Sequence, residues 1–489
     1  MTRTDLSRRG VLGVLSGAGI AATAPKSWAA AAADWTIGVS NAPIEGFADS
    51  AMTRLHGRMP AHLSGQLYRN GPAWFRYGDE VTGHWFDGDG MVQRYDLTAD
   101  GVRHSGRFVN TVKRRAEQTA GRFLMPGFGT AAAAGAPVTA QDDANAANTS
   151  VLKVGDELWA LWEAGSPYRL DLDTLETRGP QTFRNDLKGM AFLAHPKVEP
   201  SGRIWSAGFA GKRAWIWQLD SLGGLERGEM IELPVAGYTH DWAVTERHLI
   251  FPLQPWVTGD HGQSIAERMV WRPEQGLQIL VVDKADFSQR RIYELPAAFY
   301  FHTGDAWEDS DSTLHFDVCL ANTPQFAAQG GHNIVRGKID RNYAGADLVL
   351  VSLFPDGRAV TRPTGVTAEF PQTDHRVQGL RRDKVVHVHG ETPGHPGARA
   401  LALFDWKTGK RKVHDFGAAA MVEEALFVPR PGGSDELDGW LVGTVLDLKA
   451  RATQLHVFDA RHIDDGPVAS WQGQHATPLG FHGTFVSGR

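Results

Sequence analysis

Short runs of alternating apolar and polar residues, each ended by turn-forming residues, recur along almost the whole chain. Examples are DELWALWEAGSPYRLDLDTLE from residue 156, SGRIWSAGFAGKRAWIWQLD from residue 201 and RALALFDWKTGKRKVHDF from residue 399. A period of two is typical of strands with one buried face, and the turn residues between the runs predict hairpins. The 55 glycines and 25 prolines suit many tight turns. Helical periodicity is scarce and clearest around residues 114–122, so the protein is predicted to be mainly β.

The length of the chain selects among β architectures. The 489 residues contain no Pro- or Ser-rich linker, and they are too many for one ordinary sandwich or barrel. Propeller blades take roughly 40 to 50 residues each, so seven blades leave room for long loops on one face. We expect an all-β, seven-bladed β-propeller over residues 30–489, with a cap of loops and short helices over the active-site face. The repeats are too degenerate to give the blade number directly. Two candidates for closing the ring are GQLYRNGP, residues 65–72, and LGFHGTFV, residues 479–486.

The first residues have the features of a twin-arginine export signal. Arg8 and Arg9 precede a mildly apolar run that contains glycine, and a small-x-small site, SWA, ends at Ala29. A membrane anchor is the alternative, but the run is shorter than the roughly 20 residues of a spanning helix. We expect residues 1–29 to engage the twin-arginine export machinery and to be cleaved, which places the mature protein in the periplasm.

Composition excludes some partners and some chemistry. The net charge is −6 and no basic patch is present, so nucleic acid is not expected as a partner. The one cysteine, Cys319, cannot form an internal disulfide and lies in the alternating run LHFDVCL. We interpret Cys319 as core filler in a strand, with a reactive thiol as the alternative.

Four of the 20 histidines stand out by their neighbours: His195 in AHPKVEPSG, His240 in YTHDWAVTERHLIFP, His302 in FYFHTGDAWED and His482 in GFHGTFV. Their intervals of 45, 62 and 180 residues match no local metal-binding motif. Separations of a blade or more would let inner strands bring them together on a propeller axis. Imidazole suits iron, copper, zinc or nickel. From the residues alone, a metal site and ordinary surface or hydrogen-bonded core histidines both stay open.

These segments, with YRNGP at residues 68–72 and HWFDGDGMV at residues 84–92, resemble the carotenoid cleavage oxygenase family. The resemblance covers nearly all of the chain after the signal. The family pattern has proline near the first histidine, an acid and an aromatic residue after the second, an acidic-aromatic tail after the third, and FHG at the fourth. Trp242 stands where phenylalanine is usual and Asp305 where asparagine is common, and neither is expected to touch a ligand. The resemblance implies one iron(II) per subunit, bound by His195, His240, His302 and His482.

The resemblance also implies three glutamates behind the ligands. The matching positions are Glu163 in ALWEAG, Glu369 in AEFP and Glu424 in EEALFV. They would serve His240, His302 and His482, because a carboxylate on the second ring nitrogen fixes the tautomer of a ligand. An ion-paired strand residue is the alternative for each. The register of Glu424, next to Glu423, is the least secure.

The resemblance implies a dioxygenase, an oxidoreductase that incorporates both atoms of dioxygen. The family reaction adds them across one alkene and gives two carbonyl products, and no acid or base residue is demanded. Long polyenes and phenolic stilbenes compete as substrates. In the stilbene-cleaving branch a tyrosine and a lysine engage the phenol; here Arg114, in FVNTVKRRAEQ, takes the tyrosine position, and AQDDANAANTS has no lysine. This favours a carotenoid or apocarotenoid. A non-catalytic propeller that binds ligands or partners is the alternative of another class.

Two further segments carry predictions. In HWFDGDGMV we expect a structural turn, with Gly88 and Gly90 free to take positive φ and Asp87 and Asp89 bonded to nearby backbone. GRFLMPGFGTAAAAGAP, residues 121–137, is rich in apolar side chains and nearly free of charge. It is expected either to form an apolar mouth in peripheral contact with a membrane or to be an ordinary buried loop.

Overall fold

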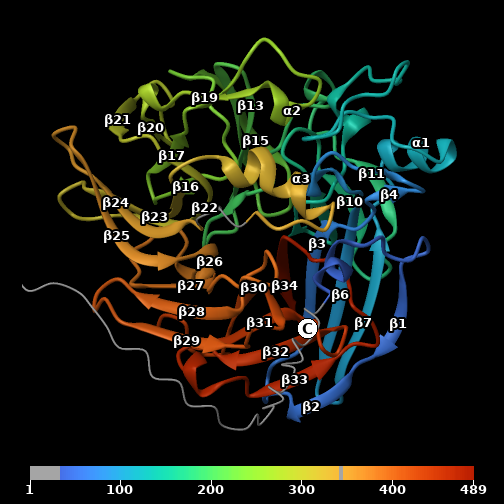
Figure 1. Cartoon of the computed structure of the whole chain (residues 1–489). Helices are drawn as coiled ribbons and strands as arrows, with labels where there is room; N and C mark the ends of the chain where they lie inside the picture. The colour runs from blue at the N-terminus through green and yellow to red at the C-terminus, as the bar shows by residue number, and fades with distance from the viewer. Residues whose placement is uncertain (1–33, 341–344, 489) are drawn as a thin grey trace, which may run out of the picture. The chain divides into compact units, whose positions relative to one another are not determined.

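Alternating strands build seven antiparallel sheets of four or five strands, and each sheet is one blade of a propeller (Figure 1). The structure, a computed structural model, describes residues 34–340 and 345–488. The predicted seven-bladed β-propeller is therefore confirmed.

The strands of each blade are consecutive in sequence, apart from those that close the ring. Blade by blade, from the amino terminus, they are β1 (Phe47–Ala51), β3 (Gly65–Pro72), β6 (Gly90–Thr98), β7 (Gly101–Phe108) and β34 (His482–Ser487); β8 (Ser150–Val154), β9 (Glu157–Leu161), β10 (Tyr168–Asp171) and β11 (Thr177–Pro180); β12 (Lys197–Val198), β13 (Ile204–Ala210), β14 (Arg213–Leu219) and β15 (Leu225–Glu232); β16 (Ala243–Val244), β17 (His248–Leu253), β20 (Leu277–Asp283) and β21 (Arg290–Leu295); β22 (Phe299–Glu308), β23 (Leu314–Ala321), β24 (Asp347–Leu353) and β25 (Ala359–Thr367); β26 (Glu369–Gln372), β27 (Lys384–His389), β28 (Ala400–Asp405) and β29 (Arg411–Asp415); and β30 (Ala420–Pro429), β31 (Gly439–Asp447), β32 (Ala452–Asp459), β33 (Ala469–Gln472) and β2 (Thr53–Gly57). Two short ribbons, β4 (Arg76–Tyr77) with β5 (Glu80–Val81) and β18 (Trp256–Thr258) with β19 (Met269–Trp271), lie in the loops.

Strands from the two ends of the chain close the ring. β34 pairs with β3 over six residue pairs, from Gly65 with Ser487 to Asn70 with His482, and Figure 1 shows the red strand beside the blue one. The predicted closure by residues 65–72 and the FHG segment is confirmed. A second closure was not predicted: β2 adds an outer strand to the last blade by pairing with β33.

Helices are few and lie in the connections between strands. α1 (Val112–Ala120) begins after Thr111, whose hydroxyl accepts a hydrogen bond from Arg114 N, and ends at Gly121 in the left-handed region (φ 64°). The predicted helix at 114–122 is confirmed, with both ends about two residues earlier. The remaining helical segments are short: α2 (Ile265–Arg268), α3 (Gly331–Ile334), a π-helical turn (Phe326–Gly330) and 3₁₀ turns at Trp35–Val39, Trp85–Asp87, Gln141–Ala144, Asn185–Leu187, Pro273–Gln275, His375–Val377 and Ile463–Asp465.

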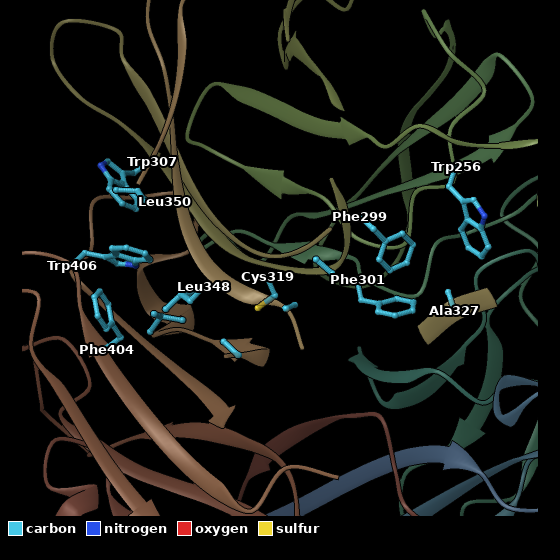
Figure 2. Packing of buried hydrophobic residues seen from close by; sticks show 14 of the residues in the cluster. Trp256, Phe299, Phe301, Trp307, Cys319, Ala327, Leu348, Leu350, Phe404 and Trp406 are labelled. Carbon is cyan, nitrogen blue, oxygen red and sulfur yellow. The ribbon is translucent and has the colours of Figure 1, made fainter. Parts of the chain in front are cut away.

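One hydrophobic cluster joins the inner strand β22 to its neighbours. Figure 2 shows Phe299 and Phe301 between Cys319 and Trp256, and the two phenylalanine rings meet edge to face with their centres 4.9 Å apart. Cys319 is fully buried, and burial raises the pKa of its thiol well above the usual value. Its interpretation as core filler is confirmed, because a buried neutral thiol is unreactive.

The propeller belongs to one unit that spans residues 33–489. The predicted export signal, residues 1–29, lies outside the described residues. Within the described ranges, the helices are too short or too polar to cross a membrane.

Candidate metal centre

Four histidines converge at the centre of the ring. His302 lies within β22 and His482 begins β34, while His195 and His240 lie just before β12 and β16. Successive Nε2 atoms are 3.0, 3.3 and 3.1 Å apart in the order His195, His240, His302, His482. One nitrogen of each ring lies within 4.8 Å of the other three. The structure thus brings together all four histidines for which the resemblance implied a ligand role.

Three of the four rings are held from behind by a carboxylate. The pairs are His240 Nδ1 with Glu163 Oε1, His302 Nδ1 with Glu369 Oε2 at 2.6 Å, and His482 Nδ1 with Glu424 Oε1 at 2.9 Å. Each carboxylate occupies Nδ1, so Nε2 is the nitrogen that faces the other rings. Glu424 stays ionised and accepts from Nδ1 of His482, whereas burial raises the pKa of Glu369 to about 8. The structure pairs these glutamates with the histidines that the resemblance implied.

The donor set fits one divalent metal ion. Lone pairs that face one another at such short distances repel unless a cation lies between them. Imidazole nitrogens bound at about 2.1 Å and at right angles to one another lie about 3.0 Å apart. The observed spacings of 3.0 to 3.3 Å between neighbouring Nε2 atoms agree with this value. The four rings therefore form a four-histidine metal site.

Burial controls the charge of the rings. Burial first, and then the neighbouring imidazoles, hold the pKa of His195 and of His302 well below the usual range. Burial acts in the same direction on His240, but the Glu163 carboxylate outweighs it and raises the pKa of that ring. Protons therefore compete with a metal at a higher pH at His240 than at His195 and His302.

The fourth ring, His195, is linked to a different carboxylate. Its Nδ1 is 4.0 Å from Asp241 Oδ1. Asp241 accepts from Lys197 Nζ at 2.7 Å, and from the backbone N and Oγ1 of Thr303 at 2.8 and 2.9 Å. Although burial raises the pKa of Asp241, Lys197 brings it below the usual value. Lys197, Asp241 and Thr303 each lie within two positions of a converging histidine in the sequence. Their hydrogen bonds therefore tie three ligand segments together.

Trp242 has a role that the sequence comparison with the family did not predict. Its ring stacks on Phe251, with centres 4.9 Å apart, and its Nε1 donates to the carbonyl oxygen of His195 at 2.9 Å. The expectation that Trp242 does not touch a ligand residue is therefore wrong. A phenylalanine has no N–H for this bond, so the indole fixes the backbone of His195 in a way that the usual residue does not.

Glu424, rather than Glu423, bonds a converging histidine ring. Glu424 bonds the ring of His482 and pairs with Arg69 Nη1 at 3.0 Å. Glu423 accepts instead from Thr444 Oγ1 and from a backbone amide. Burial raises the pKa of Glu424, but His482 and Arg69 outweigh it and lower the pKa, so the carboxylate stays ionised. The pairing of β30 is irregular between Val422 and Ala425, and both carboxylates lie beside Arg69, but only Glu424 bonds a converging ring, which resolves the register.

The variant Glu424→Gln is expected to bind metal about 10- to 100-fold more weakly, because the ring of His482 loses an anionic partner. Competition with a chelator measures this affinity. The control is Glu423→Gln, which changes a neighbouring buried carboxylate that bonds no ring. Equal loss of affinity in both variants would contradict the role given to Glu424.

A cavity of about 310 Å³ opens beside the four rings, within the usual size of small-molecule sites. His240, His302 and His482 form part of its wall. Large apolar side chains form much of the rest, among them Phe86, Phe128, Trp162, Phe301, Phe326 and Phe481. Since Phe326 belongs to the π-helical turn and α2 and α3 also contribute, the predicted cap of loops and short helices covers this cavity.

Arg114 does not line the cavity. Its guanidinium lies 3.5 Å from the centre of the Phe108 ring and bonds Asp89 Oδ2 at 3.2 Å. Lys113 lines the cavity instead, with Nζ 2.7 Å from Asp89 Oδ1 and 2.8 Å from Glu117 Oε2. Successive helical residues point about 100° apart, so neighbours on α1 face different surroundings. The substrate argument built on Arg114 is therefore wrong.

Residues 121–137 form a loop that buries large apolar side chains in its first half and is half-buried or exposed from Gly129 onward. Phe123, Met125 and Phe128 are buried, Leu124 is half-buried, and the exposed positions are small or polar. These buried side chains therefore do not form the apolar mouth expected here, and the membrane contact stays a prediction. The alternative of a buried loop holds for Phe123, Met125 and Phe128.

Two carboxylates hold this loop through its backbone. Glu117 Oε1 accepts from the amides of Leu124 and Met125 at 3.0 and 2.9 Å. Asp87 Oδ1 accepts from the amide of Phe128 at 2.5 Å. These bonds turn apolar side chains inward and place Phe128 in the cavity wall. Composition alone could not distinguish this loop from an exposed one.

The DGDG segment is structural, as predicted, but for a different reason. Gly88 has φ −62°, and the φ of Gly90 is not positive either. A Cβ on Gly88 would lie 2.8 Å from the Phe75 ring, and one on Gly90 would lie 2.1 Å from the Ala147 carbonyl oxygen. The glycines are required for close approach, not for positive φ.

Several residues that position the site were not predicted. Tyr238 donates its hydroxyl to Glu163, 3.0 Å from each carboxylate oxygen. Lys197 and Asp241 link the ligand segments, and Arg69 supports Glu424. Tyr238, Lys197 and Asp241 lie inside the motifs around the histidines, and Arg69 lies in YRNGP. Their proximity to the ligand motifs was the available signal, but their partners lie far away in sequence.

A propeller that carries four convergent imidazoles beside an apolar cavity defines a metal-dependent enzyme for an apolar small molecule. Residues 42–487 match the RPE65 family, described as retinal pigment epithelial membrane protein. The chain belongs to this family, the carotenoid cleavage oxygenases. It is an oxygenase of the kind that cleaves carbon–carbon double bonds.

Individual relatives show how far the similarity extends. The chain is 30% identical over 481 residues to apocarotenoid-15,15'-oxygenase of Synechocystis, covering 93% of this chain and 96% of the relative. It is 26% identical over 484 residues to resveratrol cleavage oxygenase 1 of Aspergillus fumigatus, with coverage of 91% and 94%. The structure of cobalt-substituted Synechocystis ACO superposes with a TM-score of 0.84 and 27% identity, over 93% of this chain and 98% of the other.

Proposed function

We propose that the protein is a non-haem iron(II) dioxygenase that cleaves one double bond of a carotenoid or apocarotenoid into two carbonyl products. The observation that carries this proposal is the position of the four-imidazole site in the wall of an apolar, aromatic cavity. A long conjugated hydrocarbon suits such a wall, and the relative with 30% identity is named an apocarotenoid oxygenase.

Iron(II) on four neutral imidazoles would supply the activation of dioxygen. Both oxygen atoms enter the products, one at each alkene carbon, so the reaction needs no external reductant. The residues of this chain then position the substrate. Phe301 and Phe86, whose rings meet edge to face at 5.9 Å, form part of the wall beside the imidazoles. These apolar side chains position the substrate and limit the access of water to the reacting bond.

A stilbene is the second candidate substrate. The relative named resveratrol cleavage oxygenase supports it, and so does Lys113, a cation in the cavity wall. However, the ammonium of Lys113 is already paired with Asp89 and Glu117. The segment of residues 140–150 gives Ala144, Ala146, Asn148 and Thr149 to the wall and no lysine. These contacts favour the polyene.

Incubation of the iron-loaded protein with β-carotene, an apocarotenal and a hydroxystilbene under ¹⁸O₂ tests the proposal. We expect a polyene to give two carbonyl fragments, each with one labelled oxygen, identified by mass. Cleavage of the stilbene alone would show that the substrate is a stilbene and not a polyene. Iron-loaded protein that produces no aldehyde or ketone from any of the three would contradict both.

We also propose that the protein is exported by the twin-arginine route. Arg8, Arg9 and the SWA site support this, and the family match begins at residue 42, after the proposed signal. Residues 1–33 fused to a fluorescent protein are expected to reach the periplasm of a bacterium with this pathway. Replacement of both arginines by lysine should retain the fusion in the cytoplasm; equal export of the two fusions would contradict the proposal.

A further inference from the structure

The wall of the cavity contains a primary amine. Among the described residues that line the cavity, Lys113 on α1 is the only lysine. A neutral amine condenses with an aldehyde: the nitrogen lone pair attacks the carbonyl carbon, a C=N bond replaces the C=O bond, and the oxygen leaves as water. Cleavage of a double bond releases two carbonyl compounds beside this wall. An imine on Lys113 would therefore fill part of the cavity and obstruct the next substrate.

Burial by itself would make Lys113 such a nucleophile. Its side chain is 3% exposed, and burial lowers the pKa of the ammonium because a low-dielectric surrounding disfavours the charged form. Lysines in apolar pockets become reactive at neutral pH in this way. Lys113 thus combines the burial that activates an amine with a position in the wall of a cavity that receives carbonyl compounds.

Two carboxylates oppose the effect of burial. Lys113 Nζ lies 2.7 Å from Asp89 Oδ1 and 2.8 Å from Glu117 Oε2. Asp89 lies just before β6, whereas Glu117 lies on the next turn of α1, so the amine is held from two segments. Together the carboxylates outweigh burial and raise the pKa of Lys113 above the usual value. An ammonium has no lone pair and does not attack a carbonyl carbon.

The other charged or titratable neighbours leave this arrangement intact. Arg114 Nη1 binds the second oxygen of Asp89 at 3.2 Å. Asp87 is occupied by the backbone amide of Phe128 and by the hydroxyl of Thr130 at 2.7 Å. Burial raises the pKa of Tyr77, so this phenol stays neutral. The charge on Lys113 therefore depends on its two direct carboxylate partners.

We infer that Asp89 and Glu117 protect the cavity from its own product, by holding Lys113 as an ammonium that does not form an imine. The inference rests on the proposed function, which supplies the carbonyl compounds, and it applies to the products of a polyene and of a stilbene alike. It gives the buried ion cluster a chemical role in addition to its contribution to stability.

The variant Glu117→Gln tests the inference. Glutamine keeps an oxygen for the amides of Leu124 and Met125, and it places an N–H donor against Lys113 Nζ, which favours the neutral amine. Loss of an adjacent opposite charge should raise the fraction of free amine about 10- to 1,000-fold. The iron-loaded protein is incubated without dioxygen with an apocarotenal and cyanoborohydride, which reduces an imine to a stable secondary amine. Peptide mass then compares Lys113 with the exposed Lys410.

In the wild type we expect the modified fraction at Lys113 to be at least about tenfold below that at Lys410. Glu117→Gln should raise the fraction at Lys113 at least about tenfold. Asp89→Asn removes the other carboxylate from a different segment and should act in the same direction, so the test does not depend on the folding of one variant. The matched control is Glu423→Gln, a buried carboxylate of the cavity wall that binds no lysine; it should leave Lys113 unmodified.

Equal modification of Lys113 and Lys410 in the wild type would overturn the inference, and so would an unreactive Lys113 in both Glu117→Gln and Asp89→Asn. Because the aldehyde is added and no turnover is needed, this result is separate from the proposed function. Absence of cleavage of every substrate under dioxygen would refute the function alone. Cleavage by a wild type whose Lys113 reacts freely would refute the inference alone.

Discussion

The variant His302→Ala is expected to lose both its metal and its cleavage activity. His302 contributes one of the four converging nitrogens, and its Nε2 lies within 3.3 Å of the Nε2 atoms of both His240 and His482. Loss of a partner behind a ligand already weakens metal binding about 10- to 100-fold, so loss of the ligand itself should exceed this. Metal analysis of the purified variant and product analysis by mass measure the two effects.

The variant His315→Ala is the control for this experiment. His315 lies on β23, next to β22 in the same blade, and bonds Ser352 and Asp309 away from the site. It should keep its metal. If His302→Ala retained a full complement of iron and its activity, the assignment of the four ligands would be wrong.

The variant Lys113→Met is expected to lower the free energy of unfolding by about 3 kcal/mol or more, because it leaves two buried carboxylates without their shared cation. Lys113, Asp89 and Glu117 are 3%, 2% and 0% exposed. Burial would lower the pKa of Lys113, but the two carboxylates raise it above the usual value. A raised lysine pKa means that this stabilisation is complete at neutral pH and is lost only as strong alkali removes the proton. Denaturant titration measures the change.

The variant Arg115→Met changes an exposed cation on the same helix and serves as the control. Its effect should stay within about 0.5 kcal/mol. A similar small loss in Lys113→Met would show that the buried cluster is not held by the lysine. Because Glu117 also binds the backbone of Leu124 and Met125, we expect proteolysis of residues 121–137 to accelerate in Lys113→Met only.

The main features of fold and site could be predicted because they depend on local patterns. Strand alternation and chain length indicate the propeller, and the neighbours of each histidine carry the resemblance. The Glu163 and Glu369 pairings followed from the same motifs. By contrast, the bond from Trp242 to the carbonyl of His195 joins residues 47 positions apart. It depends on how two blades meet, which no local pattern describes.

The failures have a common physical cause. Arg114 and Lys113 are adjacent and both basic, and only the rotation of α1 decides which one meets the cavity. The apolar residues in 121–137 were equally compatible with burial and exposure. Asp87 and Glu117 decided between them by binding the loop backbone. Charge and composition indicate which groups need partners, while the tertiary arrangement decides which partners they find.

The strand that completes the ring also completes the metal site, and this sets an order of events during biosynthesis. β34 is synthesised after every other described strand, and its first residue, His482, pairs with Asn70 in β3. Three imidazoles can therefore emerge from the ribosome long before the fourth can join them. The full donor set exists only once the first and last strands have met, so metal selection takes place in whichever compartment the finished chain first folds.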